Sequence, residues 1–88
     1  MRVVVVTKDN TDYARLVREF LENFVRQTGR NLEVLDPETP EGDSFCRTYD
    51  IVEYPSIVAL SNDGQMQNMW RGTTLPTVGE VSYYARQD

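Results

Sequence analysis

The sequence predicts a single α/β domain whose elements follow in the order β-α-β-α-β-β-α. Three observations support this: a run of four valines near the N-terminus, a long segment with helical apolar spacing after it, and an Asn-Asp-Gly turn signal between two later strand-like segments. A chain of 88 residues has room for one core, so residues 1–88 are expected to form one domain. With 40% apolar and 26% charged residues, the composition is typical of a globular protein.

The first three elements are predicted to be a strand, a helix and a strand. Val3 to Val6 is uniformly β-branched, which is typical of a strand buried on both faces. From Tyr13 to Val25, apolar residues recur at spacings of three and four, which predicts an amphipathic helix that ends at Gly29. Leu32 to Leu35 is the second strand. Two strands joined through a long helix are expected to pair in parallel.

The next segment is expected to be a loop followed by a short helix. Residues 37–43 are acidic and contain proline and glycine, which predicts a loop, and the helix is expected over residues 44–49. A third apolar strand is expected over residues 57–60.

The C-terminal part is predicted to be a hairpin and a helix. Asn62-Asp63-Gly64 is a strong hairpin signal, with residues 65–71 as the returning strand. Strict alternation along that strand would place Met66, Asn68 and Trp70 on one face. A final helix is expected from Thr77 onward.

Composition excludes several classes of function. Without histidine there is no imidazole base and no histidine-ligated metal, and a single cysteine forms neither an internal disulfide nor a structural zinc site. A net charge of −5 argues against nucleic-acid binding. The apolar N-terminal run is too short for a signal peptide or a membrane span, so we expect a cytoplasmic protein with no membrane association and no cofactor. One acidic cluster lacks the EF-hand spacing, so we expect no metal site there: Asp36, Glu38, Glu41 and Asp43.

Several short motifs, taken in order, carry a resemblance to a known family. Tyr54-Pro55-Ser56, directly before the third strand, resembles the thioredoxin motif in which a cis-proline precedes that strand. Tyr49-Asp50-Ile51-Val52 is similar to the Tyr-Gly-Ile/Val segment ahead of that proline, and Asp63-Gly64 is similar to the hairpin turn. The chain therefore resembles the thioredoxin/glutaredoxin superfamily along nearly its whole length. The resemblance implies a thioredoxin-like fold, a mixed four-stranded sheet flanked by helices.

The sequence departs from that family at the redox motif. Glutaredoxin-like sequences place Cys-x-x-Cys at the start of the first helix, after a lead-in similar to Val6-Thr7-Lys8-Asp9. Here Thr11 and Ala14 occupy the aligned positions. A threonine hydroxyl stays protonated at neutral pH, and alanine cannot resolve a mixed disulfide. Thiol–disulfide exchange by the CxxC mechanism is therefore excluded.

Two residues keep an enzymatic alternative open. Thr11 lies among N-cap formers, so we interpret it first as a helix cap, although a hydroxyl at this position in glutathione transferase-like relatives binds the glutathione thiolate. Those relatives also place an acidic-Ser pair at a later helix start, which the segment from Thr77 to Glu80 lacks. Cys46, beside Arg47, is either a reactive thiol or a small apolar filler.

The main prediction is a redox-inactive binding or protein-interaction module. The resemblance implies that the backbone beside the proline pairs with an extended peptide or a partner protein, with glutathione as the other candidate ligand. The expected contact surface consists of two loops that meet in this fold: Asn10, Thr11, Asp12 and Tyr13, with Tyr54, Pro55 and Ser56.

Overall fold

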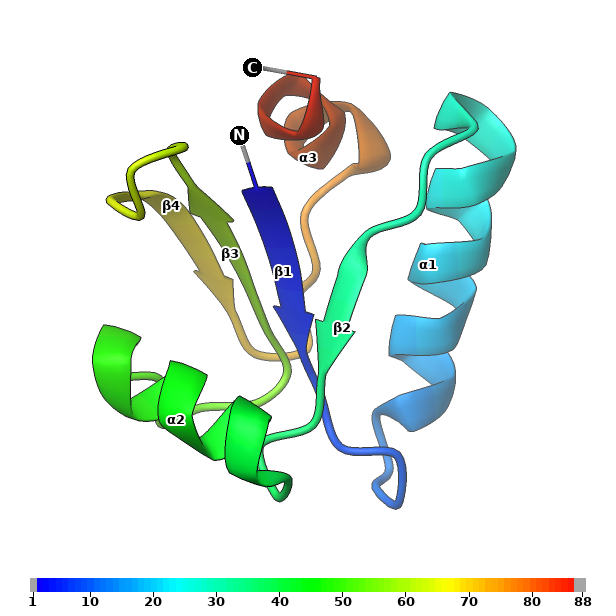
Figure 1. Ribbon diagram of the computed structural model, residues 1–88. Helices are drawn as coiled ribbons and strands as arrows, with labels where there is room; N and C mark the ends of the chain where they lie inside the picture. The colour runs from blue at the N-terminus through cyan, green and yellow to red at the C-terminus, as the bar shows by residue number, and fades with distance from the viewer. Residues whose placement is uncertain (1, 87–88) are drawn as a thin grey trace.

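The computed structural model describes residues 2–86, and its elements follow the predicted order (Figure 1). The strands are β1 (Arg2–Val6), β2 (Glu33–Leu35), β3 (Ser56–Leu60) and β4 (Met66–Arg71), and the helices are α1 (Ala14–Thr28), α2 (Pro40–Tyr49) and α3 (Val78–Ala85). The sheet order is β2-β1-β3-β4, with β1 parallel to β2 and the other two pairs antiparallel. The prediction of a mixed four-stranded α/β sheet is confirmed.

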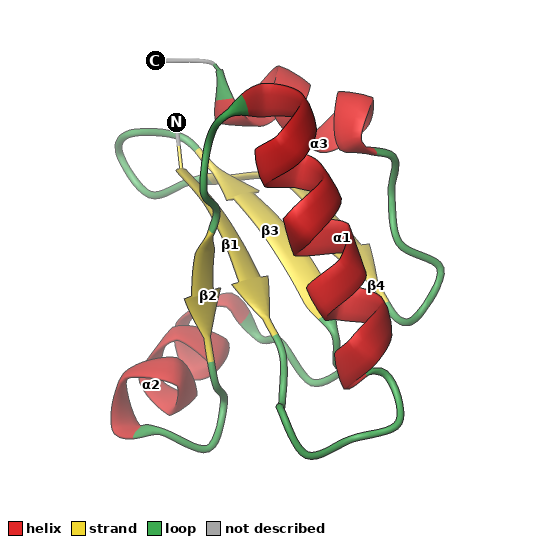
Figure 2. Ribbon diagram, turned by 90° about the vertical axis from the view of Figure 1, so that its right-hand side faces the viewer, coloured by secondary structure: helices red, strands yellow, loops and turns green. Residues whose placement is uncertain are grey.

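The sheet separates two apolar cores, with α1 and α3 on one face and α2 on the other (Figures 1 and 2). The central strands β1 and β3 are buried on both faces, as the valine run predicts. The first core contains Val3, Val5, Val17, Phe20, Phe24, Ile57, Ala59 and Val81. The second contains Val4, Val6, Leu35, Phe45, Cys46, Ile51, Val58 and Leu60. Within residues 2–86, no helix is long and apolar enough to cross a membrane.

Helix α2 begins one turn earlier than the sequence predicts, so the expected loop over residues 37–43 is wrong in its second half. The Thr39 hydroxyl accepts a hydrogen bond from the Gly42 N–H at 3.0 Å, and Pro40 occupies the first helical turn. Gly42 lies directly against the β2–α2 turn, where a Cβ would come within 1.8 Å of the Asp36 carbonyl oxygen. Glycine at this position therefore allows the start of α2 to pack on the turn that precedes it.

The predicted face of Met66 is also wrong, because β4 contains a β-bulge. Met69 pairs with Val58 and Asn68 with Ala59, but Met66 pairs with Leu60, so the register shifts at this point. Directly opposed residues share a face. Met66 therefore lies on the α2 face, opposite to Asn68.

Candidate functional site

The pairing of β1 with β3 brings two loops together at one end of the sheet. Val6, the last residue of β1, pairs with Ser56, the first residue of β3. Residues 7–13, here called the first loop, therefore lie beside residues 50–55, here called the proline loop. The two loops carry six of the seven predicted contact residues, and Ser56 adjoins them. The Tyr54–Pro55 peptide bond is cis.

A contact between Lys8 and Tyr54 connects the two loops. The Lys8 Nζ atom lies 5.2 Å from the centroid of the Tyr54 ring, within the range of a cation–π interaction. Such a contact stabilises a partly exposed site by about 0.5–1 kcal/mol. Lys8 was not among the predicted site residues, because only the fold places its ammonium group over this ring.

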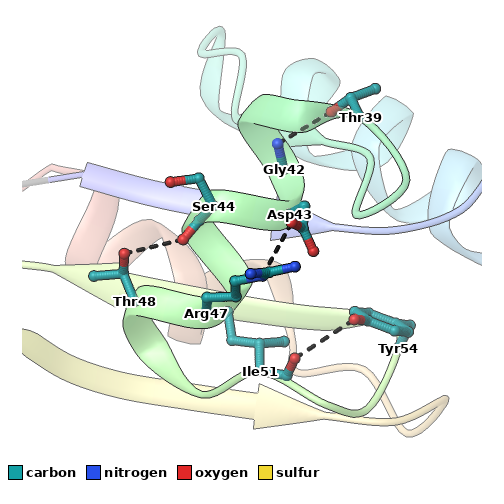
Figure 3. A network of polar contacts seen from close by, with 8 residues as sticks. All are labelled: Thr39, Gly42, Asp43, Ser44, Arg47, Thr48, Ile51 and Tyr54. Atoms are coloured by element: carbon teal, nitrogen blue, oxygen red, sulfur yellow. Dashed lines mark hydrogen bonds and ion pairs between the residues drawn. The ribbon is translucent and has the colours of Figure 1, made fainter.

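The Tyr54 side chain packs against the second core, and its hydroxyl lies beside Cys46 of α2. Its hydroxyl donates to the Ile51 carbonyl oxygen at 3.5 Å (Figure 3). Burial raises the pKa of Tyr54 above its usual value, and the Cys46 thiol beside the hydroxyl raises the pKa further. The phenol therefore remains a neutral hydrogen-bond donor at neutral pH.

The peptide groups of Tyr54 are free, whereas the groups on both sides of it are bonded. The Pro55 carbonyl accepts a hydrogen bond from the Gly72 N–H at 2.8 Å, and the Ser56 hydroxyl donates to the Glu53 carbonyl at 2.5 Å. In residues 2–86, neither the N–H nor the C=O of Tyr54 has a protein partner. One donor and one acceptor on the same residue are the groups that an added strand uses.

Thr11 is not the cap of α1, contrary to the prediction. Its hydroxyl donates to the Lys8 carbonyl at 3.0 Å, and its own carbonyl accepts from the Ala14 N–H at 3.3 Å. The N-cap position is held by Tyr13, and no side chain in the described part of the chain caps the helix. These two hydrogen bonds form a turn within the first loop. The Thr11 hydroxyl is bonded in this turn and does not cap α1.

Tyr13 faces inward. The residue is half-buried and packs against the first core. Its hydroxyl is buried and has no hydrogen-bond partner among residues 2–86. Asn10 and Asp12 are exposed, so the polar tip of the first loop is its accessible part.

Cys46 lies in the second core, on the inner face of α2. Its side chain is 6% exposed and it is a free thiol. This environment fits an apolar filler, because a thiol that attacks a disulfide must be accessible.

The N-terminus of α3 is stabilised by a capping box between Thr77 and Glu80. The Thr77 hydroxyl accepts from the Glu80 N–H at 3.1 Å, and the Glu80 carboxylate accepts from the Thr77 N–H at 3.4 Å. This capping box occupies the segment in which the transferase pattern would hold the γ-glutamyl group of glutathione.

A small cavity adjoins the proline loop on its other side. Its volume is about 120 Å³, enough for one side chain of moderate size. It is lined by Asp50, Ile51, Val52, Glu53, Ser56, Met69 and Arg71. Among residues 2–86, no three His, Cys, Asp or Glu side chains are grouped so that they could hold a metal ion.

Comparisons with known proteins identify the fold. No protein-family model and no curated protein sequence matches the chain. Thioredoxin 1 from Thermosipho africanus TCF52B matches with a TM-score of 0.66 at 13% identity, over 97% of this chain and 90% of that one. A malarial protein matches with a TM-score of 0.65 at 12% identity, over 96% and 91%. A thioredoxin from Thermus thermophilus matches with a TM-score of 0.60 at 16% identity, over 96% and 70%. The chain has a thioredoxin-like fold and lacks the CxxC motif.

Proposed function

We propose that this thioredoxin-fold chain is a redox-inactive module that binds an extended segment of a partner protein along the proline loop. The free peptide groups of Tyr54 are the observation that carries the proposal. An extended segment that donates to the Tyr54 carbonyl and accepts from its N–H would add to the protein by strand pairing. The absence of a second cysteine leaves the chain without a dithiol for exchange.

Features around Tyr54 would give such binding its specificity. The Lys8 ammonium group lies over the Tyr54 ring and connects the two loops, and Asn10 and Asp12 are exposed in the first loop. The cavity on the other side of the proline loop has room for one side chain of the bound segment. Backbone pairing and the Tyr54 ring thus both supply affinity, and the flanking side chains also supply selectivity.

Peptide selection tests this proposal. Linear peptides are selected from a displayed random library against the full chain, and their affinities are measured by calorimetry for the wild type and for Tyr54→Ala. Tyr83→Ala is the matched control, because Tyr83 is 54% exposed and lies in α3, outside the two loops. Circular dichroism checks that both variants are folded.

We expect Tyr54→Ala to weaken peptide binding at least about tenfold and Tyr83→Ala to leave it unchanged. A library that yields no binder contradicts the proposal, and so does binding that Tyr54→Ala leaves unchanged.

A second titration distinguishes the enzymatic alternative, a glutathione-binding or monothiol enzyme that uses Thr11 or Cys46. Amide NMR spectra are recorded with millimolar glutathione. No shifts are expected, because the Thr11 hydroxyl is bonded within its own loop and Cys46 is buried. Shifts focused on Thr11, Ala14 and residues 54–56 would favour the glutathione alternative over the proposed module.

A further inference from the structure

A threonine hydroxyl is buried without a hydrogen-bond partner directly after β1. Thr7 is 6% exposed, and its Oγ1 atom has no partner among residues 2–86. A buried hydroxyl that stays unpaired lowers the stability of a protein. The four residues before Thr7 are valines, and a fifth valine would have nearly the same shape without this cost. A ligand that bonds the hydroxyl would explain why a threonine occupies this position.

The Thr7 side chain lies on the face of the sheet that α1 covers (Figure 2). Val5 belongs to the first core and Val6 to the second, so the alternation along the strand places Thr7 on the same face as Val5. Val34 of β2 pairs with Val5 and therefore shares this face. A cavity of about 120 Å³ lies here between α1 and β2, and both Thr7 and Val34 line it. The unpartnered hydroxyl thus faces a cavity.

Two side chains of opposite charge line the same cavity without pairing. Asp9 and Arg18 are both exposed, and neither forms an ion pair with the other or with any other side chain of residues 2–86. The rest of the lining is apolar: Ala14, Val17, Leu21 and Val34. A ligand that satisfies all of these groups carries an anionic and a cationic group close together on a small aliphatic body.

From these observations we propose that the cavity between α1 and β2 binds a small aliphatic α-amino acid in its zwitterionic form. The carboxylate of the ligand accepts hydrogen bonds from the Arg18 guanidinium and the Thr7 hydroxyl, and its ammonium group donates to the Asp9 carboxylate. Its side chain lies against Leu21 and Val34. A zwitterion has no net charge, so the net charge of −5 on the chain does not oppose binding. No residue of the proline loop lines this cavity, so the inference does not depend on the proposed function.

Amide NMR titrations of the full chain with free valine test the proposal. N-acetylvaline and valinamide serve as comparison probes, because each lacks one of the two charges. We expect valine to cause saturable shifts centred on Thr7, Arg18 and Val34, with a dissociation constant of about 1 mM or lower, and both analogues to bind at least about tenfold more weakly. If valine causes no saturable shifts, or if the analogues bind as tightly as valine, the proposal is overturned.

Substitution of Thr7 separates binding from stability. Thr7→Val should weaken valine binding at least about tenfold, because it removes the hydroxyl, and yet raise the urea midpoint of the free protein, because no unpaired hydroxyl remains. Thr7→Ser keeps the hydroxyl and should retain binding. Thr74→Val is the matched control, since Thr74 is exposed between β4 and α3, outside the cavity, and should change neither quantity. A Thr7→Val variant that binds valine as tightly as the wild type overturns the proposal.

The two charged contacts are tested through the preference for valine over its analogues. Asp9→Asn should abolish the preference over N-acetylvaline and keep the preference over valinamide, because only the partner of the ammonium group is lost. Arg18→Gln should abolish the preference over valinamide and keep the preference over N-acetylvaline, because only the partner of the carboxylate is lost. If either variant retains the preference that it is expected to lose, the proposed contacts are overturned.

Discussion

The helix N-termini of this protein are built in two different ways. α2 and α3 begin at Thr39 and Thr77, whose hydroxyls accept from N–H groups three residues on, and both helices have acidic residues in the first turn. α1 is the longest helix, yet it begins at Tyr13 with no side-chain cap within the described residues and no acidic residue in its first turn. The start of α1 lies in the candidate site. Capping stabilises the two helices that only support the fold, and it is absent at the helix end where the two loops meet.

The largest expected effect tests how firmly the start of α2 is fixed. Gly42→Ala should lower the free energy of unfolding by about 3 kcal/mol, because its Cβ would collide with the backbone of Asp36. Urea denaturation followed by circular dichroism measures the change.

Gly79→Ala is the matched control within α3. A Cβ at Gly79 has its nearest neighbour at 3.9 Å, so this substitution should be neutral or stabilise the protein by up to about 1 kcal/mol. Equal destabilisation by the two alanines would contradict the close packing of α2 on its turn.

A smaller effect compares the caps directly. Thr77→Ala should cost about 1 kcal/mol, because it removes the capping box of α3. Thr11→Ala should cost about 0.5 kcal/mol or less, because Thr11 bonds the Lys8 carbonyl in a loop and caps no helix. If the Thr11 variant proves as unstable as the Thr77 variant in urea, the contrast between the helix starts is wrong.

The last prediction uses the pH dependence of stability to distinguish an ion pair from a helix cap. Arg2 makes a two-point contact with Glu33, at 2.8 and 2.6 Å, and this hydrogen bonding lowers the pKa of Glu33. Because the folded pKa lies below the unfolded one, the contribution is present above the unfolded pKa and is lost as pH falls through the folded pKa. Both side chains are substantially exposed, so Glu33→Gln should cost less than about 1 kcal/mol at neutral pH.

An acid titration of unfolding free energies checks this. The difference between the wild type and Glu33→Gln should shrink toward zero as Glu33 becomes protonated. The difference caused by Thr39→Ala should persist, because a threonine hydroxyl does not titrate in this range. A Glu33 difference that is independent of pH would exclude the ion pair as its source.

Local patterns were sufficient to predict most of the fold. The valine run, the spacing of α1 and the turn before Gly64 each depend on neighbours in sequence, and each is confirmed. The start of α2 was predictable in principle, since Thr39-Pro40 is an N-cap followed by proline, but acidic residues and a glycine suggested a loop. The face of Met66 was not predictable, because a bulge is set by the pairing of two strands.

The candidate site was predicted only in outline. The sequence indicates which two loops meet, because Pro55 precedes β3 and the first loop follows β1. It does not indicate that Lys8 covers the ring of Tyr54, or that the peptide groups of Tyr54 are free. These features depend on the distance between the two loops and on which backbone groups the sheet leaves without a partner.

Hydrogen exchange at the Tyr54 amide tests the central claim most directly. With a selected peptide bound to the full chain, we expect the Tyr54 N–H to exchange at least about tenfold more slowly than in the free protein, because it donates to the added strand. If the peptide binds but the exchange of this amide is unchanged, while protection appears only elsewhere on the protein, the proline loop is not the binding edge.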